Sequence, residues 1–115
     1  MAWVRIDDDL FAHPKILRAW SDCPASIGLW TIALSWAGRQ LTDGHIPVEI
    51  VRNFMPQKRQ RERATQALEN AGLWSANGNG WEIHDYLDRN PSRDQVLNKR
   101  RADSARKRVG KNGRA

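Results

Sequence analysis

The chain of 115 residues has a single cysteine, Cys23, so it forms no internal disulfide and lacks the cysteine framework of small secreted domains. Long apolar runs are missing as well. The longest charge-free apolar stretch, 24–38, is shorter than the about 20 residues that a membrane-spanning helix needs. The opening segment, MAWVRIDDD, has no apolar core of a signal peptide. We therefore expect a cytoplasmic protein with no membrane partner.

The sequence also has few residues arranged for catalysis or metal binding. Its histidines are far apart and its cysteine stands alone, so no spacing matches a zinc site. His84 and Asp85 are adjacent, and adjacent strand residues point to opposite faces, which argues against an acid–base pair. The acidic run at 7–9 is typical of a solvated or capping segment. Gly78 and Gly80 lie in a turn with no helix after them, unlike a phosphate-binding loop. We expect no catalytic residue, no metal and no cofactor.

Positive charge is concentrated at one end of the chain. From Ser92 onward nine lysines and arginines face two aspartates, a net charge of +7, whereas residues 1–91 carry ten cations and eleven acidic residues, a net charge of −1. We interpret this as one domain, 1–91, followed by a basic tail, 92–115. Such a division favours a polyanionic partner. Because the tail has little apolar surface, we expect it to be disordered when free and helical when bound.

The first half of the sequence predicts two helices. Pro14 suits the first turn of a helix that directs Ile16, Leu17 and Trp20 to one face. The segment 26–39 is apolar almost all round, which is typical of a buried central helix. We expect all of the tryptophans to lie in the core: Trp3, Trp20, Trp30, Trp36, Trp74 and Trp81.

The second half predicts two further helices and a hairpin. A short helix over 48–54 ends before a proline, and a longer helix follows over 58–71. Two short apolar runs, 73–76 and 81–84, flank an Asn-Gly-Asn-Gly turn and therefore predict a β-hairpin. The segment 45–47 is too short for more than one bridge of a strand.

The order of these elements is helix, short strand, helix, turn, helix and hairpin, which is the order of a winged helix-turn-helix domain. We therefore expect a mainly α fold of the α+β class, with a small β-hairpin wing and a basic C-terminal helix or tail. In such domains the second helix of the pair enters the major groove of DNA. Here that helix is 58–71, with Ala64, Leu68 and Ala71 as its buried stripe.

Helix 58–71 carries the candidate DNA-reading side chains. At 100° per residue, four of its residues lie within about 60° of one another on the side away from the buried stripe: Arg59, Arg63, Gln66 and Asn70. Side chains of these types make paired hydrogen bonds with the edges of guanine and adenine. Lys58 and Arg61 flank this face, where phosphate contacts are expected. The same mixture of residue types is also typical of an ordinary solvated helix surface.

Charged residues outside this helix face also bear on DNA binding. Two basic triplets of the tail are seven positions apart, so they recur near one side of a helix that lies along phosphates: Lys99, Arg100, Arg101, Arg106, Lys107 and Arg108. The segment 52–63 has a local charge of +4, which leaves −5 for the rest of the body. Glu62 and Glu69 form a neighbouring stripe that we expect to be kept away from a duplex. The hairpin tip, 77–80, has no cation and is either a weak contact or, as we favour, only a fold element.

Several motifs resemble a known group of proteins. They are WVRIDD at 3–8, HPK at 13–15, LTDGHIP at 41–47, AGLW at 71–74, GWEIHDY at 80–86 and NPSR at 90–93. In this order they resemble small winged-helix proteins of actinobacterial phages and prophages, similar to the N-terminal domain of phage replisome organisers and replication initiators. The resemblance implies a winged-helix fold and DNA binding. A basic tail follows where such organisers have a second, helicase-engaging domain, so helicase loading is not implied.

We therefore expect a phage-type winged-helix protein that binds double-stranded DNA and acts in replication or transcription control, at the nucleoid of a bacterial host. We also expect a homodimer, because a single winged helix gains sequence specificity by pairing with a second copy. The alternative is a phage protein-interaction module that binds and inhibits a component of host machinery. The uncharged hairpin tip and the near-neutral body favour this alternative, since a winged helix presents its surface to protein as readily as to DNA.

Overall fold

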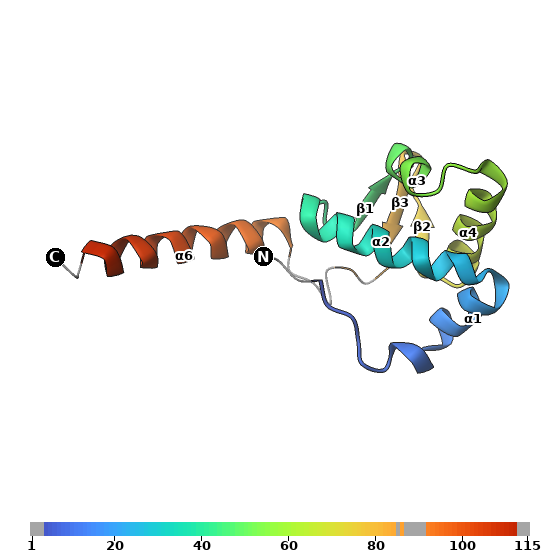
Figure 1. The fold of residues 1–115 in the computed structure, drawn as a ribbon, viewed down its shortest axis with the longest axis horizontal. Helices are drawn as coiled ribbons and strands as arrows, with labels where there is room; N and C mark the ends of the chain where they lie inside the picture. The colour runs from blue at the N-terminus through green and yellow to red at the C-terminus, as the bar shows by residue number, and fades with distance from the viewer. Residues whose placement is uncertain (1–3, 85, 87–91, 113–115) are drawn as a thin grey trace.

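The computed structural model of the chain describes residues 4–84, 86 and 92–112, with side chains as far as Arg106. It is mainly helical, with one small antiparallel sheet (Figure 1). The elements are, in chain order, the 3-10 helix η1 (Leu10–Ala12), α1 (Pro14–Asp22), α2 (Pro24–Gln40), β1 (His45–Pro47), α3 (Val48–Phe54), α4 (Lys58–Asn70), β2 (Trp74–Ala76), β3 (Gly80–Ile83) and α6 (Arg93–Asn112). The predicted helices of the body are thus present, with bounds within two residues of those expected.

Proline and small residues fix the first two helices. Pro14 and Pro24 stand in the first turn of α1 and α2, where the missing N–H of proline leaves no hydrogen bond unmade. His13 caps α1, because its Nδ1 accepts a hydrogen bond from the backbone N–H of Lys15 at 3.2 Å. Ser26 and Ala19 are both fully buried where the helices meet, and the Ser26 hydroxyl donates to the Ala19 carbonyl. These small side chains let α1 and α2 pack closely.

The orientation of α1 differs from the expected one. Ile16 and Ala19 are buried against the other helices, whereas Leu17 is 51% and Trp20 is 56% exposed. The prediction that Leu17 and Trp20 face inward is therefore wrong. Helix α1 packs on both α2 and α4, and it meets them through the face that carries the smaller Ala19. Leu17 and Trp20 lie outside that contact.

Helix α2 is the centre of the helical layer, since it contacts α1, α3, α4 and β1. Its buried face carries Leu29, Trp30, Ala33, Leu34 and Ala37. The expectation that this helix is buried all round is only partly right. Its opposite face is open, and Ile32 there is 52% exposed. The apolar face is simply wider than the contact surface that the neighbouring elements provide.

The sheet has the strand order β1-β3-β2, with both pairs antiparallel. Strand β1 pairs with β3 over three positions, so the expectation of a single bridge at 45–47 is wrong. Ile46 of β1 is fully buried, and this burial holds the short strand in place. The pairing is unusually close at Gly80, where a Cβ atom would collide with the carbonyl oxygen of Ile46. Only glycine fits at this position.

The tryptophans contribute unequally to the core. Trp30 and Trp74 are buried as expected, and Trp36 and Trp81 are half-buried against the core. The rings of Trp74 and Trp81 lie 5.8 Å apart between centroids, so they tie β2 to β3. Trp20 is exposed, contrary to expectation, and Trp3 lies outside the described residues.

The basic tail, which we expected to be disordered when free, forms helix α6 in the chain alone. This helix extends away from the body along the longest dimension of the molecule, 61 Å (Figure 1). A capping box starts it. The Ser92 hydroxyl accepts from the N–H of Gln95, and the Gln95 side chain accepts from the N–H of Ser92. The N–H of Arg93 also donates to Oδ1 of Asp43 at 2.7 Å, which joins α6 to the turn before β1. In the part of the chain that the structure describes, no helix combines the length and apolar character needed to cross a bilayer.

Candidate nucleic-acid interface

Helix α4 has one buried and one open side. Its buried residues are Ala64, Thr65, Ala67 and Leu68, and it packs against α1, α2 and β2. The predicted stripe of Ala64, Leu68 and Ala71 is buried as expected. The small alanines let the helix lie close to its neighbours, while the remaining circumference faces solvent. Helix α4 therefore presents one continuous polar face.

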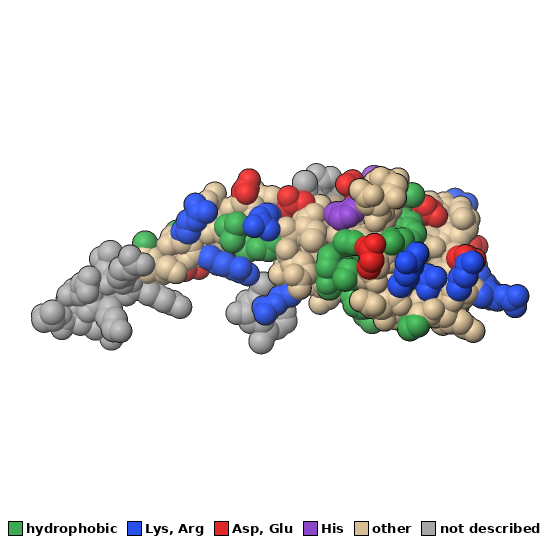
Figure 2. Space-filling view, turned by 90° about the horizontal axis from the view of Figure 1, so that it is seen from above, with side chains coloured by type: hydrophobic (Ala, Val, Ile, Leu, Met, Phe, Trp, Pro, Cys, Tyr) green, Lys and Arg blue, Asp and Glu red, His purple; other side chains and the backbone are tan. Residues whose placement is uncertain are grey.

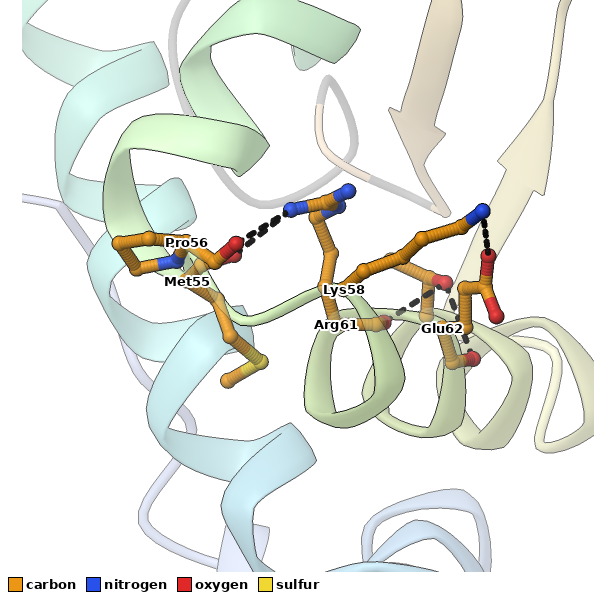
Figure 3. Close-up of polar contacts among 6 residues, drawn as sticks. Met55, Pro56, Lys58, Arg61 and Glu62 are labelled. Carbon is orange, nitrogen blue, oxygen red and sulfur yellow. Dashed lines mark hydrogen bonds and ion pairs between the residues drawn. The ribbon is translucent and has the colours of Figure 1, made fainter.

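The turn between α3 and α4 is held by an arginine (Figure 3). Nη1 of Arg61 donates hydrogen bonds to the carbonyl oxygens of Met55, at 3.2 Å, and Pro56, at 3.0 Å. These carbonyls follow the last turn of α3 and have no helical partner. Arg61 thus fixes the angle between the two helices, in addition to any phosphate contact that its free N–H groups make.

This structural role of Arg61 was not predicted from the sequence, although a signal was present. Arg61 precedes Ala64, Thr65 and Leu68 by three, four and seven positions, so it shares the buried face of α4. A long side chain at the start of a buried face reaches toward the preceding helix. The phosphate contact predicted for Arg61 stays a prediction.

Lys58 opens α4 and lies on its exposed side. Its Nζ is 4.0 Å from a carboxylate oxygen of Glu62, one turn later, and both side chains are largely exposed (Figure 3). An exposed pair of this kind contributes little to stability because water and salt screen it. The ammonium group of Lys58 is therefore free to exchange this partner for a phosphate at small cost.

The four predicted base-reading residues do lie together. Arg59, Arg63, Gln66 and Asn70 are all exposed, and they line one open groove on the polar face of α4. Nε2 of Gln66 donates to Oδ1 of Asn70 at 2.8 Å, so the two amides form a pair. Among the described residues, the guanidinium groups of Arg59 and Arg63 have no hydrogen bond and no ion pair.

Two carboxylates also border this groove. Glu62 lies on it, although its stripe was expected to be kept away from a duplex. Asp22, at the end of α1, lies on it as well. No sequence pattern points to Asp22, because its position depends on how α1 packs on α4. The groove therefore offers both hydrogen-bond donors and acceptors.

The hairpin tip is tied to the rest of the sheet. Nδ2 of Asn77 lies 2.9 Å from Nδ1 of His45, and the carbonyl of Asn79 accepts from the N–H of Val48 at 3.1 Å. The tip therefore holds the start of α3 in place. Its side chains are exposed and carry no positive charge. The tip therefore has a structural role, and the absence of a DNA contact there stays a prediction.

The cations of the tail lie on α6. The side chains of Lys99, Arg100, Arg101 and Arg106 are exposed, and Arg106 forms an ion pair with Asp103. The side chains of Lys107 and Arg108 lie outside the described residues. Figure 2 shows one group of basic side chains on the body, at the end far from α6, and another along α6 itself. The two groups of predicted contacts are therefore far apart.

The acidic run near the N-terminus is the one place in the described ranges where three metal-ligating side chains come together. One carboxylate oxygen from each of Asp7, Asp8 and Asp9 lies within 4.8 Å of the others, and all three residues are exposed. Oδ1 of Asp7 accepts from the N–H of Asp9, as in a common turn. We assign no metal to this run, because exposed carboxylates of this kind are ordinary on protein surfaces.

The candidate interface is thus the polar face of α4, with its two exposed arginines and its amide pair, together with the separate basic surface of α6. Comparison of the chain with protein-family models, with curated proteins and with solved structures gives no match.

Proposed function

We propose that residues 1–91 form a winged helix-turn-helix domain that binds double-stranded DNA through α4. The element order supports this, since β1, α3, α4 and the β2–β3 hairpin follow one another as in such domains. The sheet order β1-β3-β2 and the three-residue turn between α3 and α4 also fit. In this proposal α3 supports α4, and α4 lies in the major groove.

The observation that carries the proposal is the pair of exposed arginines, Arg59 and Arg63, one helical turn apart and free of ion pairs within the described part of the chain. A guanidinium that has no protein partner is ready to donate two hydrogen bonds to O6 and N7 of guanine. The amides of Gln66 and Asn70 continue the same groove and match the edge of adenine. Lys58 and the cations of α6 supply contacts to phosphates.

The proposal also covers the source of the protein and its role in the cell. We propose that the chain is a phage or prophage protein that controls replication or transcription at the nucleoid of its bacterial host. Two-fold pairing of chains would then place two copies of α4 in successive major grooves. A target sequence with two-fold symmetry is the expected sign of such a dimer.

The test is selection of bound duplexes from a random pool at two salt concentrations. The wild-type chain should recover a motif. Arg59→Ala with Arg63→Ala should lose it, because each paired contact to guanine contributes about 1–3 kcal/mol of discrimination, or roughly 5- to 150-fold. Equal binding of the wild type and this variant at physiological salt would refute the groove assignment.

A matched control separates sequence-specific contacts with bases from non-specific attraction to phosphates. Arg100→Ala with Arg101→Ala removes the same charge from α6, far from α4 (Figure 1). We expect it to weaken all duplexes alike and to leave the preferred motif unchanged. The slope of log affinity against log salt should become shallower by about 0.9 for each phosphate contact that is lost.

One observation favours the second candidate function, binding to a host protein. Leu17 and Trp20 form an exposed apolar pair on α1, outside the face of α4 that the DNA proposal uses. Exposed tryptophan is typical of protein contact surfaces. If one stoichiometric partner survives nuclease treatment of a host lysate, and Trp20→Ser with Leu17→Ser abolishes its capture while DNA binding is absent, this candidate replaces the first.

A further inference from the structure

The molecule has two basic surfaces at opposite ends of its long axis. The α4 surface consists of Lys58, Arg59 and Arg63, all exposed. The α6 surface consists of exposed cations of the tail helix: Arg93, Lys99, Arg100, Arg101 and Arg106. Figure 1 places α4 at one end of the body and α6 beyond the other end, in a molecule 61 Å long. Figure 2 shows the corresponding separation of basic side chains.

The rest of the chain has a net negative charge. Outside 52–63 and 92–115 the sequence has a net charge of −5. The Debye length at physiological salt is about 8 Å, far shorter than the long axis of the molecule, so the two surfaces act independently. A single straight duplex that touched both surfaces would have to pass along a body whose remaining charge is net negative.

Helix α6 is also attached in a way that keeps it away from α4. The bond from the Arg93 N–H to Asp43 and the capping box at Ser92 fix its first turn. Tyr86, just before it in the chain, is buried against Gly44, where a Cβ would lie 2.8 Å from the tyrosine Cβ. From this base a helix of 20 residues extends for about 30 Å. Folding α6 back toward α4 would break the hydrogen bond from the Arg93 N–H to Asp43.

We propose that one chain holds two separate duplex segments at once, the first through the α4 surface and the second through the α6 surface, and so bridges them. The inference rests on the proposed DNA binding of α4. The α4 surface selects sequence through base edges, whereas the α6 surface holds any duplex through its phosphates.

The experiment is a capture assay. One duplex that contains the selected motif is fixed to beads, and a second labelled duplex of unrelated sequence is free in solution. The wild-type chain should retain the labelled duplex on the beads. Arg100→Glu with Arg101→Glu should reduce this retention at least about tenfold, because two phosphate contacts become repulsive. The same variant should still shift the motif duplex in a gel, although at a higher protein concentration, because its α4 surface is intact.

Further variants test whether capture needs both surfaces. Arg59→Glu with Arg63→Glu should also abolish capture, and Arg39→Glu, an exposed arginine outside both surfaces, should leave capture unchanged. At protein concentrations at which the chain is monomeric, a mixture of the α4 and α6 variants should not restore capture, since each bridge needs both surfaces in one chain. Restoration by the mixture under these conditions would overturn the inference. A gel shift by the wild type without any capture would overturn it directly, whereas no shift at all would refute the proposed function itself.

Discussion

Arg61 offers the sharpest test of how the α3–α4 turn is held. The change Arg61→Met keeps most of the apolar stem of the side chain and removes its two hydrogen bonds to the carbonyls of Met55 and Pro56. Each such bond contributes about 1 kcal/mol net when the donor is half-exposed, so the loss should be about 2 kcal/mol. For a domain of this size each kcal/mol shifts Tm by about 4–8 °C, so Tm should fall by roughly 8–16 °C.

The measurement is thermal and urea unfolding of the full chain, followed by tryptophan fluorescence. Arg63→Met is the matched control, because Arg63 lies on the same helix, is exposed and has no partner in the described ranges. Its effect should stay within about 0.5 kcal/mol. If Arg61→Met also stays within that range, the two hydrogen bonds do not hold the turn, and Arg61 is better regarded as an ordinary surface cation.

Three further changes test other contacts. Gly80→Ala should lower the free energy of unfolding by about 3 kcal/mol, because the new Cβ collides with the Ile46 carbonyl. Gly28→Ala, in open space on α2, should raise it by about 0.5–1 kcal/mol. Equal unfolding midpoints for the two variants would contradict both expectations. Burial, with the negative charge of Asp43, raises the pKa of Tyr86 above 10.0. The folded state therefore favours the neutral phenol, so the free energy of unfolding should fall as pH rises above 10. The absorbance of this single tyrosine should titrate at a higher pH in the folded chain than in the unfolded chain. Titration at the same pH in both states would contradict this expectation. Asp43→Ala should speed amide exchange of Arg93 by about fivefold, the equivalent of one hydrogen bond, while Asp43→Asn retains the acceptor and should change it little.

Much of the fold follows from local signals in the sequence. Pro14 marks the start of α1, and the spacing of Ala64 and Leu68 identifies the buried side of α4. The hairpin follows from its Asn-Gly-Asn-Gly turn. These features depend on a residue and its near neighbours, so a pattern of fixed period is enough to find them.

The parts that could not be predicted depend on packing between distant segments. The face that α1 buries is set by the closeness of Ala19 and Ser26, and not by the larger Leu17 and Trp20. Asp22 reaches the groove of α4 only because α1 and α4 meet. The candidate site was therefore predictable where it lies on one helix, and unpredictable where a second helix contributes to it.

The tied hairpin tip has a consequence for protein engineering. Hairpin tips are usually preferred places for inserted peptides and for circular permutation. Here the carbonyl of Asn79 accepts a hydrogen bond from the N–H of Val48, the first residue of α3, and Asn77 contacts His45 across the sheet. A peptide inserted between Asn77 and Asn79 would separate these two anchors and release the start of α3. The length of this loop is thus fixed by the helix beside it, and a tag or fusion partner is better placed elsewhere on the surface.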